Sequence, residues 1–473
     1  METQDKKFIR MTTEPVEKLI CSLAVPTIVS MLVTALYNIV DTFFVGRIGT
    51  EATAGVGLAL PLMAVIQAFG FFFGQGSGNY ISRTLGAKDR ERASVMASTG
   101  FFSALLFGLL IALCGLLGLD GLLRLLGARE GLVTALTVAN ARAYLRPILC
   151  AAPFTCVSFV LNNQLRHQGN AMFAMVGIVS GAVLNVALDP LLIFGANLGV
   201  FGAALATAVS QAFGCTLLYI GTLRSDSLKI RPANFRPNLF YLKNMAVGGV
   251  PSLFRQGLNS VAVLCLNAAA AAAADPGLGD AAIAAFSVVS RIVMFIFSIV
   301  LGFGQAFQPV CGFNYGAKRY DRLRRAYVFV LRVSVLFLLT AAVLLFSFAP
   351  RLIGLFRDDP AVISIGRSAL RAQCCTLALM GAVVMTNMLY QNIGRVVGAT
   401  LLAVARQGLL FIPIVLTLPH LVRPPIWGVI LTQPLADVFT FLIAVFLAVR
   451  MYRELSRPPA SPPDEAPDIK TVI

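Results

Sequence analysis

The sequence has few charged residues and few of the residue types that build catalytic or metal centres. Of its 473 residues only 13% are Asp, Glu, Lys or Arg, and there are two histidines and one tryptophan. A soluble domain of this length needs far more polar surface, so that class is excluded. Two histidines are too few for a histidine-rich metal site, and the nine cysteines show no C-x-x-C spacing. We expect the cysteines to act as small apolar side chains.

Long apolar runs make up most of the chain. Hydrophobic residues account for 58% of it, and the mean hydropathy is +0.81. An α-helix needs about 20 apolar residues to cross a bilayer, and the periodicity of these runs is helical. The sequence therefore predicts an all-α integral membrane protein with twelve transmembrane helices. The expected spans are residues 17–45, 52–82, 93–118, 136–165, 171–195, 200–223, 243–273, 280–311, 324–349, 362–392, 397–419 and 425–450.

The basic residues predict the orientation of these spans. The net charge is +16, but the basic residues lie in short loops between apolar runs, so we expect membrane lipid and not nucleic acid as their partner. Alternate loops carry most of them, which is the bias of cytoplasmic loops. With an even number of spans, both termini are expected in the cytoplasm, in a multi-pass protein of the inner or plasma membrane. The loops assigned to the cytoplasm include Lys88, Arg90, Arg166, Lys229, Arg231, Lys318, Arg319 and Arg395.

The two halves of the chain repeat each other. The segment GQGSGNYISRTLGAKDRER (74–92) aligns without a gap with GQAFQPVCGFNYGAKRYDR (304–322). Six spans in each half, in the same orientation, indicate parallel repeats around an axis along the membrane normal. We therefore expect two six-helix lobes that face a central cavity, and a structural role for the shared G-A-K loop. The expected parts are a cytoplasmic segment (1–16), an N-lobe (17–223), a cytoplasmic linker (224–242), a C-lobe (243–452) and a cytoplasmic disordered tail (453–473).

Five motifs resemble one transporter family. They are LYNIVDTFFVGRIGTEA, LNNQLRHQGN, LNVALDPLLIFG, GAALATAVSQ and GFNYGAKRYDRLRRA, spread over nearly the whole chain. Together they are similar to multidrug and toxic compound extrusion (MATE) transporters, and most similar to prokaryotic members whose coupling acids lie in the N-lobe. The resemblance implies a secondary active exporter that exchanges organic, often cationic, compounds for H⁺ or Na⁺ by alternating access. It implies no cofactor, and we expect a monomer.

Acids within the apolar runs are the candidate coupling residues. A carboxylate at the bilayer centre costs about 2.5–3.5 kcal/mol on insertion scales, so Asp41 must face protein or water. Asn185 and Asp189 are four residues apart and share a helix face. Pro190 removes a backbone donor, which favours a helix break there. The resemblance places Asn162 and Thr207 in the same pocket. These oxygens could hold Na⁺ at Asp41, Asn185 and Asp189, or the two acids could share protons.

Other residues are assigned weaker or indirect roles. The resemblance credits Pro26, Tyr37 and Asn38 with bending the first helix and linking it to the acids. The C-lobe lacks an equivalent acid pair, and its polar candidates are Arg255, Arg406 and Asp437, with Asp437 expected to pair with one of the two arginines. Met63, Met294 and Phe307 are weak candidates for lining a cavity for flat organic molecules.

Structural explanations stand beside each of these roles. Asp41 could form an ion pair with an interior arginine, and Asp189 could be only a feature of a helix end. Asn185 could form an interhelical hydrogen bond. Thr207 could bond its own helix backbone. For the whole protein the alternative is a flippase for lipid-linked saccharides of the same superfamily. An enzyme is not expected, because His167 and His420 are far apart and no nucleophile stands beside a base.

Overall fold

The computed structural model describes residues 2–127, 134–224, 228–274 and 277–456. The expected C-terminal tail therefore lies almost entirely outside the described residues, as does the side chain of Asn38. All regular structure in the described ranges is helical. Eleven helices are long and apolar enough to span a membrane, or twelve when one bent pair counts as a single span. This agrees with the predicted twelve, and helices suit a bilayer because every backbone polar group is bonded within its own segment.

The N-lobe contains six membrane helices that match the expected spans closely. A short helix, α1 (Glu2–Thr13), precedes them, and α5 (Leu119–Leu125) follows the third. The α-helical pattern of the fifth span ends at Pro190, where a local break was predicted, and the chain continues as a π-helical turn. The membrane helices are α2 (Val16–Gly46), α3 (Thr50–Gly86), α4 (Arg90–Leu117), α6 (Ala135–His167), α7 (Ala171–Pro190) with its π-helical extension η1 (Leu191–Gly195), and α8 (Gly199–Arg224).

The C-lobe repeats this order with two interruptions. The span expected at 362–392 is a pair of helices bent by 55°, and the span expected at 397–419 contains a π-helical turn. The linker holds the short helix η2 (Pro232–Asn234). The remaining elements are α9 (Leu239–Ala273), α10 (Gly279–Gly316), α11 (Tyr320–Phe356), the bent pair α12 (Pro360–Leu377) and α13 (Leu379–Asn392), the segment α14 (Val396–Val404), η3 (Ala405–Leu409) and α15 (Phe411–Leu421), and α16 (Pro425–Ser456).

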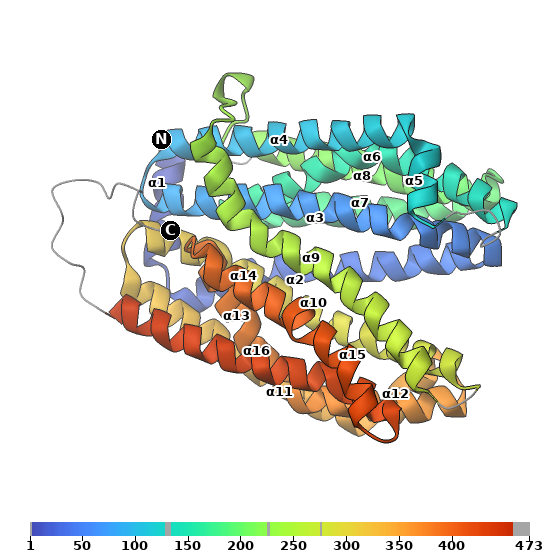
Figure 1. Ribbon diagram of the computed structural model, residues 1–473. Coiled ribbons are helices and arrows are strands. Elements are labelled where there is room, and N and C mark those ends of the chain that lie inside the picture. Colours follow the sequence, from blue (N-terminus) through green and yellow to red (C-terminus); the bar gives the residue numbers. More distant parts are fainter. Residues whose placement is uncertain (1, 128–133, 225–227, 275–276, 457–473) are drawn as a thin grey trace.

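The two lobes meet at one end of the molecule and separate toward the other (Figure 1). Helix α1 and the C-terminal end of α16 are both at the closed end. Helix α2 packs against α10, and α3 packs against α9. Because the repeat relates α2 to α9 and α3 to α10, these two contacts are equivalent across the pseudo-two-fold axis. The interface between the lobes is therefore built twice from the same pair of spans.

Glycines allow the lobes to approach closely at the closed end. Gly248 places an added Cβ only 3.0 Å from the Cα of Gly76, so two helix backbones touch there. The G-A-K loops end α3 and α10 in the same way, with Lys88 and Lys318 at φ 61° and 57°. Each of these lysines lies in the left-handed region that commonly terminates a helix. The sequence repeat is thus reproduced in the backbone.

Candidate functional site

A hydrogen-bonded polar cluster lies inside the N-lobe, between α7 and α8. The Nδ2 of Asn185 donates to the Oδ1 of Asp189 at 3.3 Å and to the Oγ1 of Thr207 at 3.4 Å. Asp189 is fully buried, and Asn185 and Thr207 are 2% and 6% exposed. The structure therefore brings together three of the predicted residues. Among the described hydrogen bonds, the Thr207 hydroxyl bonds this side chain and not its own helix.

The cluster has more acceptors than donors. The Oδ1 of Asp41, the Oδ1 of Asn185 and the Oδ2 of Asp189 are all buried, and none has a hydrogen-bond partner among the residues that the structure describes. The carboxylates of Asp41 and Asp189 are also close enough to repel each other when both are charged. Buried oxygens without donors are costly, and a carboxylate or amide oxygen can only accept. A proton or a cation would satisfy them. No described arginine or lysine pairs with Asp41. The alternative role of Asp41, as the structural partner of an interior arginine, therefore gains no support.

Two tyrosines border this acid pair. Tyr37, on α2, and Tyr144, on α6, both lie within electrostatic range of Asp41 and of Asp189. The Tyr144 hydroxyl also donates to the Sδ of Met63 at 3.8 Å. Sequence reasoning missed Tyr144, since one tyrosine in an apolar run carries no motif. Its position on α6, within electrostatic range of Asp41 and Asp189, became visible only in the fold.

Asn162 uses its amide outside this cluster. Its Nδ2 donates to the backbone oxygen of Ala174 at 3.1 Å, which joins α6 to α7. The C-lobe contains the same bond, because the Nδ2 of Asn387 donates to the oxygen of Ala399 at 2.6 Å. The pairs are related by the repeat, although no acid pair is found beside Asn387 in the part of the C-lobe that the structure describes. A bond present in both lobes indicates that the amide of Asn162 positions the start of α7.

Hydroxyl groups surround Pro26 in α2. Thr27 donates to the oxygens of Leu23 and Ala24, and Ser30 donates to the oxygen of Pro26, all at 2.8–2.9 Å. Hydroxyl groups that bond back to carbonyls one turn earlier tend to bend helices, and Pro26 itself removes a backbone bond. Helix α2 nevertheless runs unbroken from Val16 to Gly46. The sequence requirements of a bend at Pro26 are met, and the bend itself stays a prediction.

In the C-lobe, Asp437 pairs with Arg406 and not with Arg255. The Nε of Arg406 lies 3.1 Å from the Oδ1 of Asp437, and the Nε2 of Gln433 donates to the same oxygen at 2.8 Å. The Arg406 guanidinium also lies 4.8 Å from the centre of the Phe297 ring. Arg255 bonds only the Oγ of Ser252, at 3.4 Å, among the described hydrogen bonds. This resolves the choice that the sequence left open.

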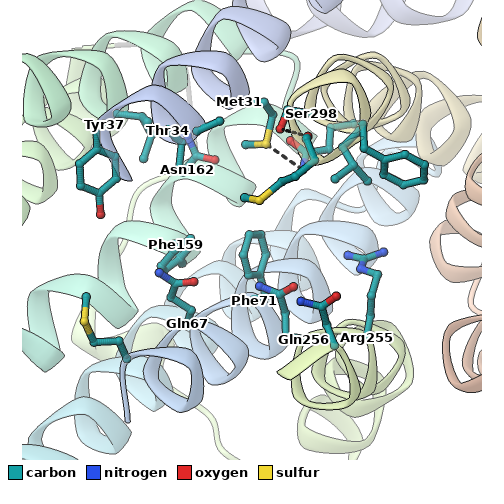
Figure 2. Close-up of a pocket in the computed structure, with 18 of the residues that line it drawn as sticks. Met31, Thr34, Tyr37, Gln67, Phe71, Phe159, Asn162, Arg255, Gln256 and Ser298 are labelled. Atoms are coloured by element: carbon teal, nitrogen blue, oxygen red, sulfur yellow. Dashed lines mark hydrogen bonds between the residues drawn. The ribbon is translucent and has the colours of Figure 1, made fainter. Parts of the chain in front are cut away.

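A cavity of about 560 Å³ lies between the lobes. Figure 2 shows its lining, with Arg255 and Gln256 on one side and Met31 and Ser298 facing them. Tyr37, Asn162, Asn185 and Thr207 line it, whereas Asp41 and Asp189 do not. Met63 and Met294 line it as predicted, but Phe307 was predicted wrongly, because it is fully buried in the C-lobe core.

Arg166 also departs from its expected place. The charge pattern assigns it to a cytoplasmic loop, yet it lies within α6, is 3% exposed and lines the cavity. Its guanidinium bonds the side-chain oxygens of Gln305 and Asn163. The bond to Gln305 crosses between the lobes. The orientation argument is unaffected, since many other basic residues share the same side, but Arg166 belongs to the cavity.

The arrangement separates two kinds of binding. The N-lobe cluster offers two carboxylates, an amide and a hydroxyl, all oxygen ligands of the kind that Na⁺ or a proton takes. Within the described ranges, no group of three His, Cys, Asp or Glu side chains is placed for metal binding. The central cavity is larger, mixed in polarity and shared by both lobes. Asn185 belongs to both, because it bonds Asp189 and lines the cavity.

Comparison with known proteins agrees with this architecture. The family model MatE matches residues 26–191 and 260–417. The chain is 28% identical to the multidrug export protein MepA of Staphylococcus saprophyticus, over 95% of this chain and 98% of that protein. It resembles the outward-facing structure of a multidrug resistance MATE family transporter of the MOP superfamily, with a TM-score of 0.88, 27% identity and coverage of 94% and 98%. It also resembles a MOP superfamily transporter from Pyrococcus furiosus, described as having reversed polarity of the binding pocket, with a TM-score of 0.84, 28% identity and coverage of 95% and 99%.

Proposed function

Because the chain belongs to the MatE family of transporters, we propose that it is a secondary active exporter of small amphipathic organic compounds, by antiport against H⁺ or Na⁺. The observation that carries this proposal is the double role of Asn185. Its amide bonds Asp189 in a cluster of unsatisfied acceptors, and the same side chain lines the cavity shared by the lobes. Occupation of the ion site is thereby linked physically to the cargo site.

Entry of an ion would change the conformation of the N-lobe by neutralising the charge of its two acids. Asp41 and Asp189 repel each other when both are ionised, and a proton or Na⁺ removes that repulsion inside a medium of low dielectric constant. Tyr37 lies near both acids and lines the cavity from α2. We propose that α2 then bends at Pro26, where a backbone bond is already missing, and reshapes the cavity. Asn162 positions α7 in this scheme, and Asn38 accompanies Tyr37 on α2.

The available driving force is sufficient for export. One positive charge that enters through a membrane potential of 100 mV supplies about 2.3 kcal/mol, and a tenfold ion gradient supplies about 1.4 kcal/mol. In the conformation described here the lobes are closed at the end that holds α1. If both termini are cytoplasmic, as the basic loops predict, this is the outward-facing state, in which the ion enters and the cargo leaves.

Reconstituted transport tests the proposal. Purified protein in vesicles is loaded with fluorescein or rhodamine 123, dyes that share a xanthene ring and carry opposite charge. A pH gradient and a Na⁺ gradient are imposed separately, and dye efflux is followed by fluorescence. We expect efflux with one of the two gradients, which names the ion, and its loss in Asp41→Asn. Absence of gradient-driven efflux of either dye would contradict the exporter. Movement of a lipid-linked saccharide in the same vesicles would then support the flippase.

A further inference from the structure

The charged residues that line the central cavity are mostly arginines. Among the described lining residues these are Arg166, Arg255, Arg406 and Asp437. Asp437 is already occupied, because both Arg406 and Gln433 bond its Oδ1. Neither Arg166 nor Arg255 forms an ion pair with any described acid. The cavity therefore presents two guanidinium groups whose charge is not balanced by the protein.

The two unbalanced arginines are held differently. Arg166 is almost completely buried and is fixed by the neutral side chains of Gln305 and Asn163. Arg255 is half-buried and has one long bond, 3.4 Å to the hydroxyl of Ser252. Figure 2 shows its guanidinium reaching into the cavity beside Gln256. Arg255 consequently has donors free to meet a ligand at the cavity surface. Arg166 is held by two bonds to neutral oxygens, and its Nε is buried without a partner among the described residues.

An unbalanced cation within a membrane protein is costly, and such residues usually mark a substrate path. The planar guanidinium matches carboxylate, sulfonate and phosphate groups, which it binds through two parallel hydrogen bonds. A cationic cargo would instead add a third positive charge to this space. The acids that could balance it, Asp41 and Asp189, are not among the lining residues. The charge of the lining therefore favours a cargo that carries a negative group.

The rest of the lining suits a flat apolar body. The rings of Phe71 and Phe159 lie with their centroids 4.7 Å apart on one wall, and Met31, Met63 and Met294 add flexible apolar surface. Methionine side chains adapt to different aromatic shapes. Gln67 and Gln256 offer amide groups beside these rings. The volume of about 560 Å³ lies within the usual range for drug-sized ligands.

We propose that the cavity takes an amphipathic organic anion. Its carboxylate, sulfonate or phosphate binds Arg255, and its ring system lies between the wall formed by Phe71 and Phe159 and the side chains of the methionines. This inference rests on the proposed export function and assigns its substrate class. The same chemistry is found in soluble aromatic acids and in the phosphate headgroup of a polyprenyl lipid. The ion site and the cargo site are then complementary, because the cation binds at the N-lobe acids and the anion binds at the arginine of the C-lobe.

Binding and transport measured together test this inference. Fluorescence anisotropy of fluorescein and of rhodamine 123 with purified protein reports binding without any gradient, and vesicle efflux reports transport. The variants are Arg255→Gln, Arg255→Lys, and Arg224→Gln as a control at the exposed end of α8. We expect fluorescein to bind and rhodamine 123 to bind at least tenfold more weakly. Arg255→Gln should lower fluorescein affinity about tenfold. Arg255→Lys should lower it less, because lysine keeps the positive charge but cannot form two parallel hydrogen bonds. Arg224→Gln should not change it.

The outcomes separate this inference from the exporter itself. Fluorescein binding that depends on Arg255, without gradient-driven efflux, would support the anion site and contradict the exporter. Efflux of rhodamine 123 that matches or exceeds fluorescein efflux, with Arg255→Gln unchanged, would support the exporter and overturn the anion site. A third arm uses a fluorescent polyprenyl phosphate in the vesicle membrane. Movement of that lipid, lost in Arg255→Gln while fluorescein fails to bind, would identify the anion as a lipid headgroup.

Discussion

Gly86 and Gly316 end equivalent helices in the two lobes, and each lies against the backbone of the other lobe's helix. A Cβ at Gly86 would meet the carbonyl oxygen of Phe313, and a Cβ at Gly316 would meet that of Arg83. Arg83 and Phe313 are themselves equivalent positions of the repeat. The closed end of the molecule is therefore a reciprocal contact, made twice by the same short motif. Separation of the lobes at this end must break both halves together.

Substitution of either glycine should weaken the closed end. Gly86→Ala and Gly316→Ala each force a methyl group into a backbone oxygen, which we expect to lower the free energy of unfolding by about 1–3 kcal/mol. Thermal unfolding in detergent checks this. Gly57→Ala is the matched control, since nothing lies within 4 Å of its added Cβ and alanine favours a helix. Equal stability of all three variants would contradict the contact.

Asn162 and Asn387 should behave alike if both only brace neighbouring helices. Each alanine variant loses one bond to a backbone oxygen, so we expect similar losses of about 1 kcal/mol in the free energy of unfolding. Neither should alter which ion drives efflux. Should Asn162→Ala abolish ion-driven efflux while Asn387→Ala retains it, Asn162 would belong to the ion site, as the family resemblance implies.

Arg406 and Asp437 form a partly buried pair that should be structural. Asp437→Asn leaves the Arg406 charge without its partner, and we expect a loss of about 3 kcal/mol in the free energy of unfolding. The double variant Arg406→Gln with Asp437→Asn removes both charges and should recover much of that loss. Thermal unfolding of the single and double variants measures the coupling. Additive losses would show that the two side chains do not stabilise each other.

Pro26 should matter for movement more than for the fold. Pro26→Ala restores a backbone N–H, so it should stiffen α2 and slow gradient-driven efflux about tenfold or more, while equilibrium dye binding stays near the wild-type value. Pro61→Ala, within α3, is a control for the loss of a proline from a membrane helix. Efflux by Pro26→Ala at the wild-type rate would remove the bend from the mechanism.

Most of the fold could be predicted from the sequence. Hydropathy and the internal repeat extend over whole helices, so they predict the number of helices and their grouping into lobes. The twelve spans, the two lobes and the two acids on α2 and α7 follow from patterns that tolerate an error of several residues in the helix bounds. The partners of individual side chains could not be predicted. The sequence offered Arg255 and Arg406 as candidate partners of Asp437. The pairing with Arg406 depends on the rotation of α16 against the π-helical turn η3.

Position along the membrane normal was also hard to derive from sequence. Arg166 follows an apolar run and counts as a loop charge, yet it lies in the last turn of α6, is buried and lines the cavity. Tyr144 carries no motif, and its place beside Asp41 depends on how α6 packs in the lobe. Such residues contribute nothing to periodicity, so only the packed structure identifies them. The charge of the cavity lining could not be predicted for the same reason.

The central claim is that the acid pair of the N-lobe couples ion entry to cargo movement. The most direct test compares gradient-driven efflux with dye counterflow, in which labelled and unlabelled dye exchange without any ion gradient, in vesicles that contain Asp41→Asn or Asp189→Asn. Asparagine resembles a protonated carboxyl, so we predict that both variants retain counterflow and lose gradient-driven efflux. The surface variant Asp120→Asn should retain both. Wild-type gradient-driven efflux by Asp41→Asn and Asp189→Asn would contradict the account.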